Sequence, residues 1–278
     1  MNNINNRRTD IDALRGFCMI WIVWYHTVHP HFVDFPFFLP TMFFISGCCF
    51  KPYSWLVFWR KKFNQLVIPF VFFYLLYYLF LIVLNYTKYH NIPIDILWSI
   101  VGVFKFYTYN GAFIVNYPLW FILALLVVQT TTYGLTKWLK DKMTILAVAF
   151  MLTLVGYYWL RTIPTPLMIG RALPYLIYYV IGTLVVFPPL TNKNSPLIKL
   201  LAFFGANSLI VFGLHDIYLT IFRIGLCHVF GQMNNLLGIF CLLSVLLVMW
   251  PTILLLNKYV PQLVAKKEIL HINHKITS

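Results

Sequence analysis

Charged residues are scarce in this chain: they make up 10% of 278 residues, and aspartate and glutamate together number only 7. Apolar residues reach 61%, and the mean hydropathy is +0.78. An average soluble domain carries about 25% charged residues. Long apolar runs account for nearly the whole sequence and leave no room for a soluble domain of ordinary size. The composition therefore predicts an integral membrane protein with a single helical bundle.

The patterns of several other protein classes are also missing. The 5 cysteines lie in or beside apolar runs without the paired spacing of a zinc site, so we predict no metal site. The formal net charge of +14 is spread over short loops and forms no basic face, which argues against a nucleic-acid partner. No small-residue cleavage site follows Arg7 and Arg8, so we expect the first apolar span to be retained.

Apolar runs of near-spanning length predict about eight helices, and an amphipathic stretch at 93–113 has no clear place. The runs lie at 13–30, 36–50, 66–86, 117–135, 143–160, 172–188, 199–222 and 234–257. We therefore predict an all-α polytopic transmembrane helix bundle of about 8–10 helices. We expect one membrane domain at 1–265 and a polar C-terminal tail at 266–278.

Basic residues predict the orientation of the bundle. With the N-terminus inside, most lysines and arginines fall on the cytoplasmic side, and the exceptions are Lys88, Lys105, Arg161, Arg171 and Arg223. The positive-inside rule then places both the N-terminus and the C-terminus in the cytoplasm.

Arg15 and His26 both lie in the first apolar span, where ionisable side chains are costly. At about 100° per residue, the steps between them amount to about three helical turns, so both side chains would leave one face. Ionisable residues in a membrane usually mark a functional site. The alternative is an arginine that reaches to the membrane interface and a histidine bonded to a neighbouring carbonyl.

A neutral histidine can take a proton from an attacking hydroxyl group, so His26 is a candidate general base. Asp34, in the outer loop HPHFVDFP, is a candidate partner that would stabilise the imidazolium form. His29 and His31 lie in the same loop, and we interpret them as interfacial.

His215 and Asp216 interrupt a second apolar run, FGANSLIVFGLHDIY. His215 is expected at about the depth of His26, so the two histidines could share one cavity. The alternatives are substrate binding and a structural hydrogen bond between helices.

The sequence WRKKFNQ places Arg60, Lys61 and Lys62 next to each other between two apolar runs. Arginine and lysine neutralise phosphate oxygens, so this cluster is a candidate phosphate site. The alternative is ordinary positive charge on the cytoplasmic side.

These segments together resemble the acyltransferase 3 family of membrane acyltransferases. IDALRGFCMIWIVWYHT has the family's arginine and histidine at the family's spacing, Arg15 and His26. FFISGCCF, RKKFNQLVIPF, PLWFILALL, LPYLIYYVIGTLV and SLIVFGLH resemble later family segments in the same order. The chain departs from the family at Asn64 and Gln65, where relatives often continue with arginine, and it is short for the family.

The resemblance implies an O-acyltransferase of the bacterial inner membrane that moves an acetyl group from acetyl-CoA to a hydroxyl group of a cell-surface carbohydrate or glycolipid. Acetyl-CoA would be a donor substrate, with no tightly bound cofactor, and the protein would also contact membrane lipid. His26, Arg15 and Asp34 would be catalytic. Arg15, Arg60, Lys61 and Lys62 would hold the donor, while His215, Asp216 and Trp120 would bind the acceptor.

Two alternatives from other classes remain at this stage. The chain could be a transporter or exporter whose polar residues line a substrate path, although neither internal repeats nor paired broken helices are visible in its sequence. It could also be a non-catalytic membrane subunit with the same fold, although Arg15 and His26 are both present.

Overall fold

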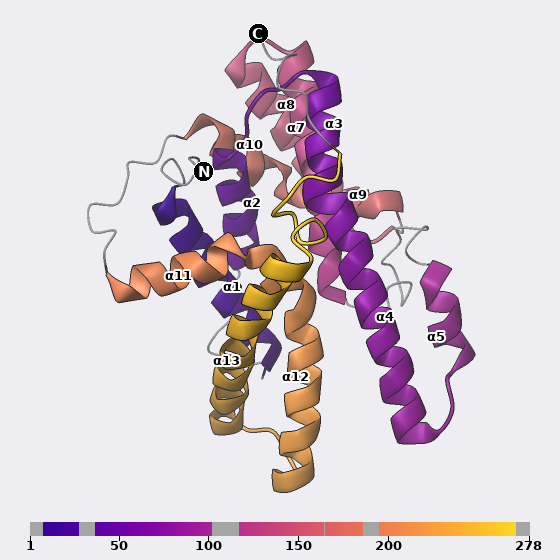
Figure 1. Cartoon of the computed structure of the whole chain (residues 1–278). Helices are drawn as coiled ribbons and strands as arrows, with labels where there is room; N and C mark the ends of the chain where they lie inside the picture. Colours follow the sequence, from indigo (N-terminus) through magenta and orange to yellow (C-terminus); the bar gives the residue numbers. More distant parts are fainter. Residues whose placement is uncertain (1–7, 28–36, 102–116, 164, 186–194, 271–278) are drawn as a thin grey trace.

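The computed structural model describes residues 8–27, 37–101, 117–163, 165–185 and 195–270, and every regular element in these ranges is a helix. Among these residues, 5 helices are long and apolar enough to cross a membrane: Trp55–Tyr89, Lys142–Leu160, Pro166–Leu184, Ser208–Phe230 and Asn235–Tyr259. The prediction of an all-α polytopic membrane bundle is confirmed (Figure 1). The cytoplasmic placement of both termini and the number of crossings stay predictions.

The first helices of the chain frame the site described below. They are α1 (Thr9–Thr27) and α2 (Phe38–Cys48). A long element follows, in which α3 (Trp55–Lys62) passes through a π-helical turn (Phe63–Val67) into α4 (Ile68–Tyr89). Such a turn holds one residue more than an α-helical turn, so it changes the direction of the side chains on either side of it.

The remaining helices complete the bundle. They are α5 (Ile94–Trp98), α7 (Trp120–Trp138), α8 (Lys142–Val155), α9 (Ile169–Ala172), α10 (Leu176–Leu184), α11 (Pro196–Ala206), α12 (Ser208–Phe230) and α13 (Asn235–Tyr259). Short 3-10 or π-helical segments adjoin several of them, at Ser99–Val101, Tyr117–Leu119, Gly156–Leu160, Pro166–Met168 and Leu173–Tyr175. The unplaced stretch at 93–113 therefore begins with short helical segments, and the part after 101 lies outside the described residues.

The apolar run predicted as one helix at 199–222 forms two helices, because the helix is interrupted at Asn207, between α11 and α12. The Asn207 side chain takes part in the break. Its Nδ2 donates to the Phe203 carbonyl at 2.8 Å, and its Oδ1 accepts from Asn257 Nδ2 at 2.9 Å. A short amide side chain can compete in this way with the regular helical bonds. Figure 1 shows the result: α11 lies across the view, whereas α12 runs down it.

Helix α1 packs tightly against α11 through two glycines. A Cβ atom added to Gly16 would overlap the Leu201 carbonyl, and one added to Gly205 would overlap the Asp12 carbonyl. Small residues of this kind let helix backbones approach closely inside a membrane. This contact fixes α1, which carries Arg15 and His26, beside the helix interruption at Asn207.

Candidate functional site

Helix α1 places Arg15 in its second turn and His26 in its last turn. Arg15 Nη1 lies 3.8 Å from Asp12 Oδ1, and Arg15 Nη2 lies 3.8 Å from Cys49 Sγ at the end of α2. At about 1.5 Å per residue, Arg15 and His26 are about 16 Å apart along the helix. The two residues therefore belong to two different environments at opposite ends of one helix.

A cavity of about 510 Å³ lies at the Arg15 end. Three cationic side chains line it: Arg15 from α1, Lys62 from the end of α3 and Lys266 from the segment after α13. Uncharged polar residues add hydrogen-bonding groups, namely Ser46, Gln65, Gln129, Asn207 and Ser208. Among the lining residues that the structure describes there is no carboxylate, so the cavity favours an anion.

Two features of the backbone contribute to this cavity. The π-helical turn begins immediately after Lys62, and Gln65 and Leu66 from the turn itself line the wall. Helix α12 begins at Ser208, so its N-terminal end also lies on the wall. The helix dipole gives that end a partial positive charge, which adds to the preference for an anion.

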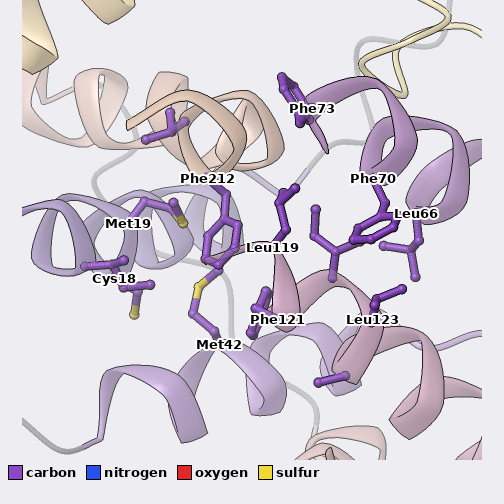
Figure 2. Packing of buried hydrophobic residues seen from close by; sticks show 14 of the residues in the cluster. Cys18, Met19, Met42, Leu66, Phe70, Phe73, Leu119, Phe121, Leu123 and Phe212 are labelled. Atoms are coloured by element: carbon purple, nitrogen blue, oxygen red, sulfur yellow. The ribbon is translucent and has the colours of Figure 1, made fainter. Parts of the chain in front are cut away.

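Buried apolar side chains also line the cavity, and we call four of them its floor: Met19, Met42, Phe121 and Phe212. Each is at most 6% exposed, and they come from α1, α2, α7 and α12. The rings of Phe121 and Phe212 lie 5.1 Å apart. Figure 2 shows these side chains packed together in the core. Neither His26 nor His215 is among the lining residues, and Phe212 contacts both the cavity and His215.

His26 and His215 are brought together next to Phe212. Their ring centroids are 5.4 Å apart, and the His215 ring lies 5.8 Å from that of Phe212. The side chain of His215 is fully buried, and its Nδ1 lies 3.0 Å from the Val211 carbonyl and 2.9 Å from the Phe212 carbonyl. Carbonyl oxygens only accept hydrogen bonds, so Nδ1 carries a proton. Within the part of the chain that the structure describes, Nε2 has no hydrogen-bond partner, and it is left as an acceptor when the ring is neutral.

Two residues of α12, Arg223 and Asp216, form hydrogen bonds to neighbouring helices. Arg223 Nη2 donates to the backbone carbonyls of His26 at 2.5 Å and Thr27 at 3.3 Å, and so binds the last turn of α1. Asp216 Oδ2 accepts a 2.6 Å hydrogen bond from the Tyr77 hydroxyl group on α4. These bonds join α1, α4 and α12 and hold the backbone of His26 beside His215.

Trp120 lies in a different place, on the wall of a second cavity of about 550 Å³. Its ring is 6.1 Å from that of Tyr175, and the Arg171 guanidinium lies 5.9 Å from its centroid. The other lining residues are Pro40, Tyr157, Arg161, Pro174 and Tyr178. Aromatic faces with arginines beside them suit a ligand that has both flat and anionic parts.

Of the remaining predicted site residues, the described ones, Arg60 and Lys61, do not line the first cavity. Asp34 lies outside the described residues, as do His29 and His31. Lys61 Nζ lies 3.7 Å from the centroid of the Tyr53 ring, and neither Arg60 nor Lys61 lines the cavity. The roles predicted for Asp34, Arg60 and Lys61 stay predictions.

Sequence reasoning missed four residues that the structure places at the site: Tyr77, Arg223, Asn64 and Lys266. Arg223 follows Asp216 by two helical turns, so a shared helical face was a usable signal. Tyr77 lies in a run rich in aromatic residues and carries no such signal. Asn64 and Lys266 meet the site through contacts between distant parts of the chain, which no local pattern predicts.

Comparison with known proteins decides the family. The family model described as an acyltransferase domain, acyltransferase 3, matches residues 8–187. The chain belongs to the acyltransferase 3 family. The matched region holds Arg15, His26, Lys62 and Trp120, whereas His215, Asp216 and Lys266 lie beyond it. No curated protein and no solved structure gives a significant match. The protein is thus a multi-pass membrane acyltransferase.

Proposed function

We propose that this acyltransferase moves an acetyl group from acetyl-CoA to a hydroxyl group of a cell-surface carbohydrate or glycolipid, in the bacterial inner membrane. The observation that carries the proposal is the division of α1, which has Arg15 in a cationic cavity and His26 against a buried histidine. Acetyl-CoA presents phosphate groups at one end and a thioester at the other. Such a donor needs cations and a base at separate places.

The donor's phosphates would be held in the cavity by Arg15, whose guanidinium forms two parallel hydrogen bonds to such groups, and by Lys62. Arg60 and Lys61 immediately precede the cavity residue Lys62 in the sequence, and they would attract the donor electrostatically. The acyl end would then pass the apolar floor. Met19 and Met42 suit that passage because unbranched methionine side chains change rotamer easily.

His26 would act as the general base of an O-acetyl transfer. It takes the proton of the acceptor hydroxyl while the hydroxyl oxygen forms a bond to the thioester carbonyl carbon. The tetrahedral intermediate then collapses, the carbon–sulfur bond breaks, and the proton passes from His26 to the leaving thiolate of CoA. Asp34 would stabilise the imidazolium form between these steps.

The acceptor would be held by groups beyond the floor. His215 Nε2, which is buried and has no partner among the described residues, would accept a hydrogen bond from a hydroxyl group of the sugar, and Asp216 would accept another. The cavity around Trp120 would stack on sugar rings through its aromatic faces, while Arg161 and Arg171 favour an acceptor with negative charge.

Acetyl transfer is tested with the purified protein in sealed vesicles that contain the host's surface glycan. Radiolabelled acetyl-CoA is added to the outside, and vesicles without the protein serve as the control. We expect the acetyl label to become covalently bound to the glycan, which mass spectrometry of the glycan detects. Movement of glycan across the vesicle membrane without any acetyl incorporation would instead identify a transporter.

A further inference from the structure

The segment after α13, residues 261–270, forms part of the cavity wall, and we call it the strap. Val264, Ala265 and Lys266 of the strap line the cavity with Arg15 and Lys62. Lys266 Nζ donates a 2.8 Å hydrogen bond to the Ala206 carbonyl, at the break between α11 and α12. The strap lies outside the region that the family model matches, so it adds a cation that the matched domain does not supply.

Asn64 holds the far end of the strap through its side-chain amide. Its Nδ2 donates to the Leu270 carbonyl at 2.9 Å, and its Oδ1 accepts from the backbone N–H groups of Ile269 at 3.1 Å and Leu270 at 3.0 Å. Asn64 is only 3% exposed, so these bonds compensate for the burial of a polar group. Asn64 lies in the π-helical turn that follows Lys62. One turn of the chain therefore fixes both the strap and one wall of the cavity.

The backbone of the strap has a defined shape. The N–H groups of Lys266 and Lys267 both donate to the Pro261 carbonyl, at 2.8 and 3.1 Å. Ala265 has a left-handed backbone with a φ of 59°, which costs a residue with a Cβ atom roughly 1 kcal/mol or more. Such strain persists where surrounding contacts impose it and is common at binding sites. In this shape Lys266 lines the cavity, whereas Lys267 does not.

We propose that the strap is a clamp for the phosphate groups of the nucleotide donor, with Lys266 as a phosphate-binding cation and Asn64 as the residue that positions it. This inference rests on the proposed function. An ammonium group has three N–H donors, so Lys266 can bind the Ala206 carbonyl and a phosphate oxygen together. The phosphate groups of the donor lose hydration water when they enter the cavity. Each of the three cations around the cavity then neutralises part of their negative charge.

The clamp is tested by measuring the Kd of 3′,5′-ADP, which carries phosphates of CoA without its acyl arm, for the detergent-solubilised full chain by calorimetry. Lys266→Ala is compared with Lys267→Ala, a matched variant of a neighbouring exposed lysine. Loss of a charge-assisted hydrogen bond predicts a Kd about 10-fold higher for Lys266→Ala. Lys267→Ala is expected to stay at the wild-type value. Equal Kd values for the two variants overturn the clamp.

Asn64→Ala provides a second, independent test. The backbone amides of Ile269 and Leu270 should exchange hydrogen faster, because both lose their acceptor. The KM for the donor should rise with kcat unchanged, and Asn64→Asp, which keeps the acceptor oxygen, should recover part of the affinity. A fall in kcat with unchanged KM contradicts the positioning role. Wild-type protein that binds neither acetyl-CoA nor 3′,5′-ADP overturns the proposed donor itself, and the clamp with it.

Discussion

The two ends of α1 differ in almost every physical respect. At the Arg15 end, a cavity of about 510 Å³ is lined by cations and polar side chains from many segments of the chain. At the His26 end, two imidazole rings pack together and one is fully buried, with backbone carbonyls and an arginine around them. Of the floor residues Met19, Met42, Phe121 and Phe212, which line the cavity, Phe212 also contacts the His215 ring.

This difference suits two separate tasks. A group that binds phosphates works best where several cations converge and the ligand can enter from water. A base that abstracts a proton works best in a fixed geometry, with its tautomer set by a neighbour and water excluded. Variants at the cavity end should therefore change donor binding, and variants at the histidine end should change the rate of transfer.

The largest effect is expected for His26→Ala. Removal of a general base lowers kcat by about 10²- to 10⁴-fold. Steady-state kinetics of acetyl transfer, at protein levels matched by immunoblot, measure the loss. His228→Ala is the matched control because His228 is an exposed histidine on α12, away from the pair. Unchanged acetylation by His26→Ala would contradict the catalytic role and favour a non-catalytic membrane subunit.

A smaller loss is expected at His215, and two substitutions separate its ring nitrogens. Asparagine places an N–H group near the position of Nδ1, whereas glutamine extends an oxygen toward the position of Nε2. Because Nε2 is the ring nitrogen to which the described residues offer no partner, it is the one that would bind substrate. His215→Gln should therefore keep more activity than His215→Asn, by about 10-fold for one lost hydrogen bond in a buried site. Initial rates at saturating donor give the comparison. The reverse order would show that His215 acts only through its carbonyl contacts.

Arg15→Gln tests the cavity end. We expect the KM for acetyl-CoA to rise about 10-fold, because a charge-assisted contact is lost, and kcat to stay within a factor of about two. Raising the salt concentration should reduce the difference from wild type because screening weakens the cation's contribution. A fall in kcat with an unchanged KM would mean that Arg15 supports His26 and does not bind the donor.

The smallest effect is expected for Arg223→Gln. The arginine, which lies on α12, donates to the carbonyls of His26 and Thr27 on α1. Its loss should therefore make the last turn of α1 more mobile. We expect kcat to fall about 3- to 5-fold, the value of one ordinary hydrogen bond, with the KM for the donor unchanged. Amide hydrogen exchange of the last turn of α1 should become faster. Unchanged kcat with faster exchange would show that the transfer step tolerates motion at this end.

The helical class and most helix positions followed from apolar length alone, because a membrane admits few other structures. The break at Asn207 did not follow, since the run from 199 to 222 is apolar on average. The break depends on one amide that bonds to Phe203 and Asn257. The π-helical turn at Phe63–Val67 was not predicted from the sequence either. Both the helix interruption and the π-helical turn lie on the cavity wall. There, tertiary contacts decide the local backbone conformation, and the apolar pattern of the sequence does not predict it.

The candidate site was predictable where one helix carries it. His215 was expected at about the depth of His26, and the rings of the two histidines lie 5.4 Å apart. The catalytic role of His26 and the binding role of His215 stay predictions. Asn64, where the sequence departs from the basic pattern of its family, had no predicted role. Its hydrogen bonds to Ile269 and Leu270 join residues that are 205 and 206 positions apart, and only the folded chain shows them.

The division of tasks along α1 is tested most directly by measuring the Kd of acetyl-CoA and the single-turnover rate of acetyl transfer on the same preparations of His26→Ala and Arg15→Gln. The account predicts that His26→Ala binds the donor like the wild type but transfers almost nothing. It predicts that Arg15→Gln binds weakly and, at saturating donor, transfers at close to the wild-type rate. The result that would contradict it is a parallel loss of binding and transfer in both variants, since one shared site would then serve both tasks.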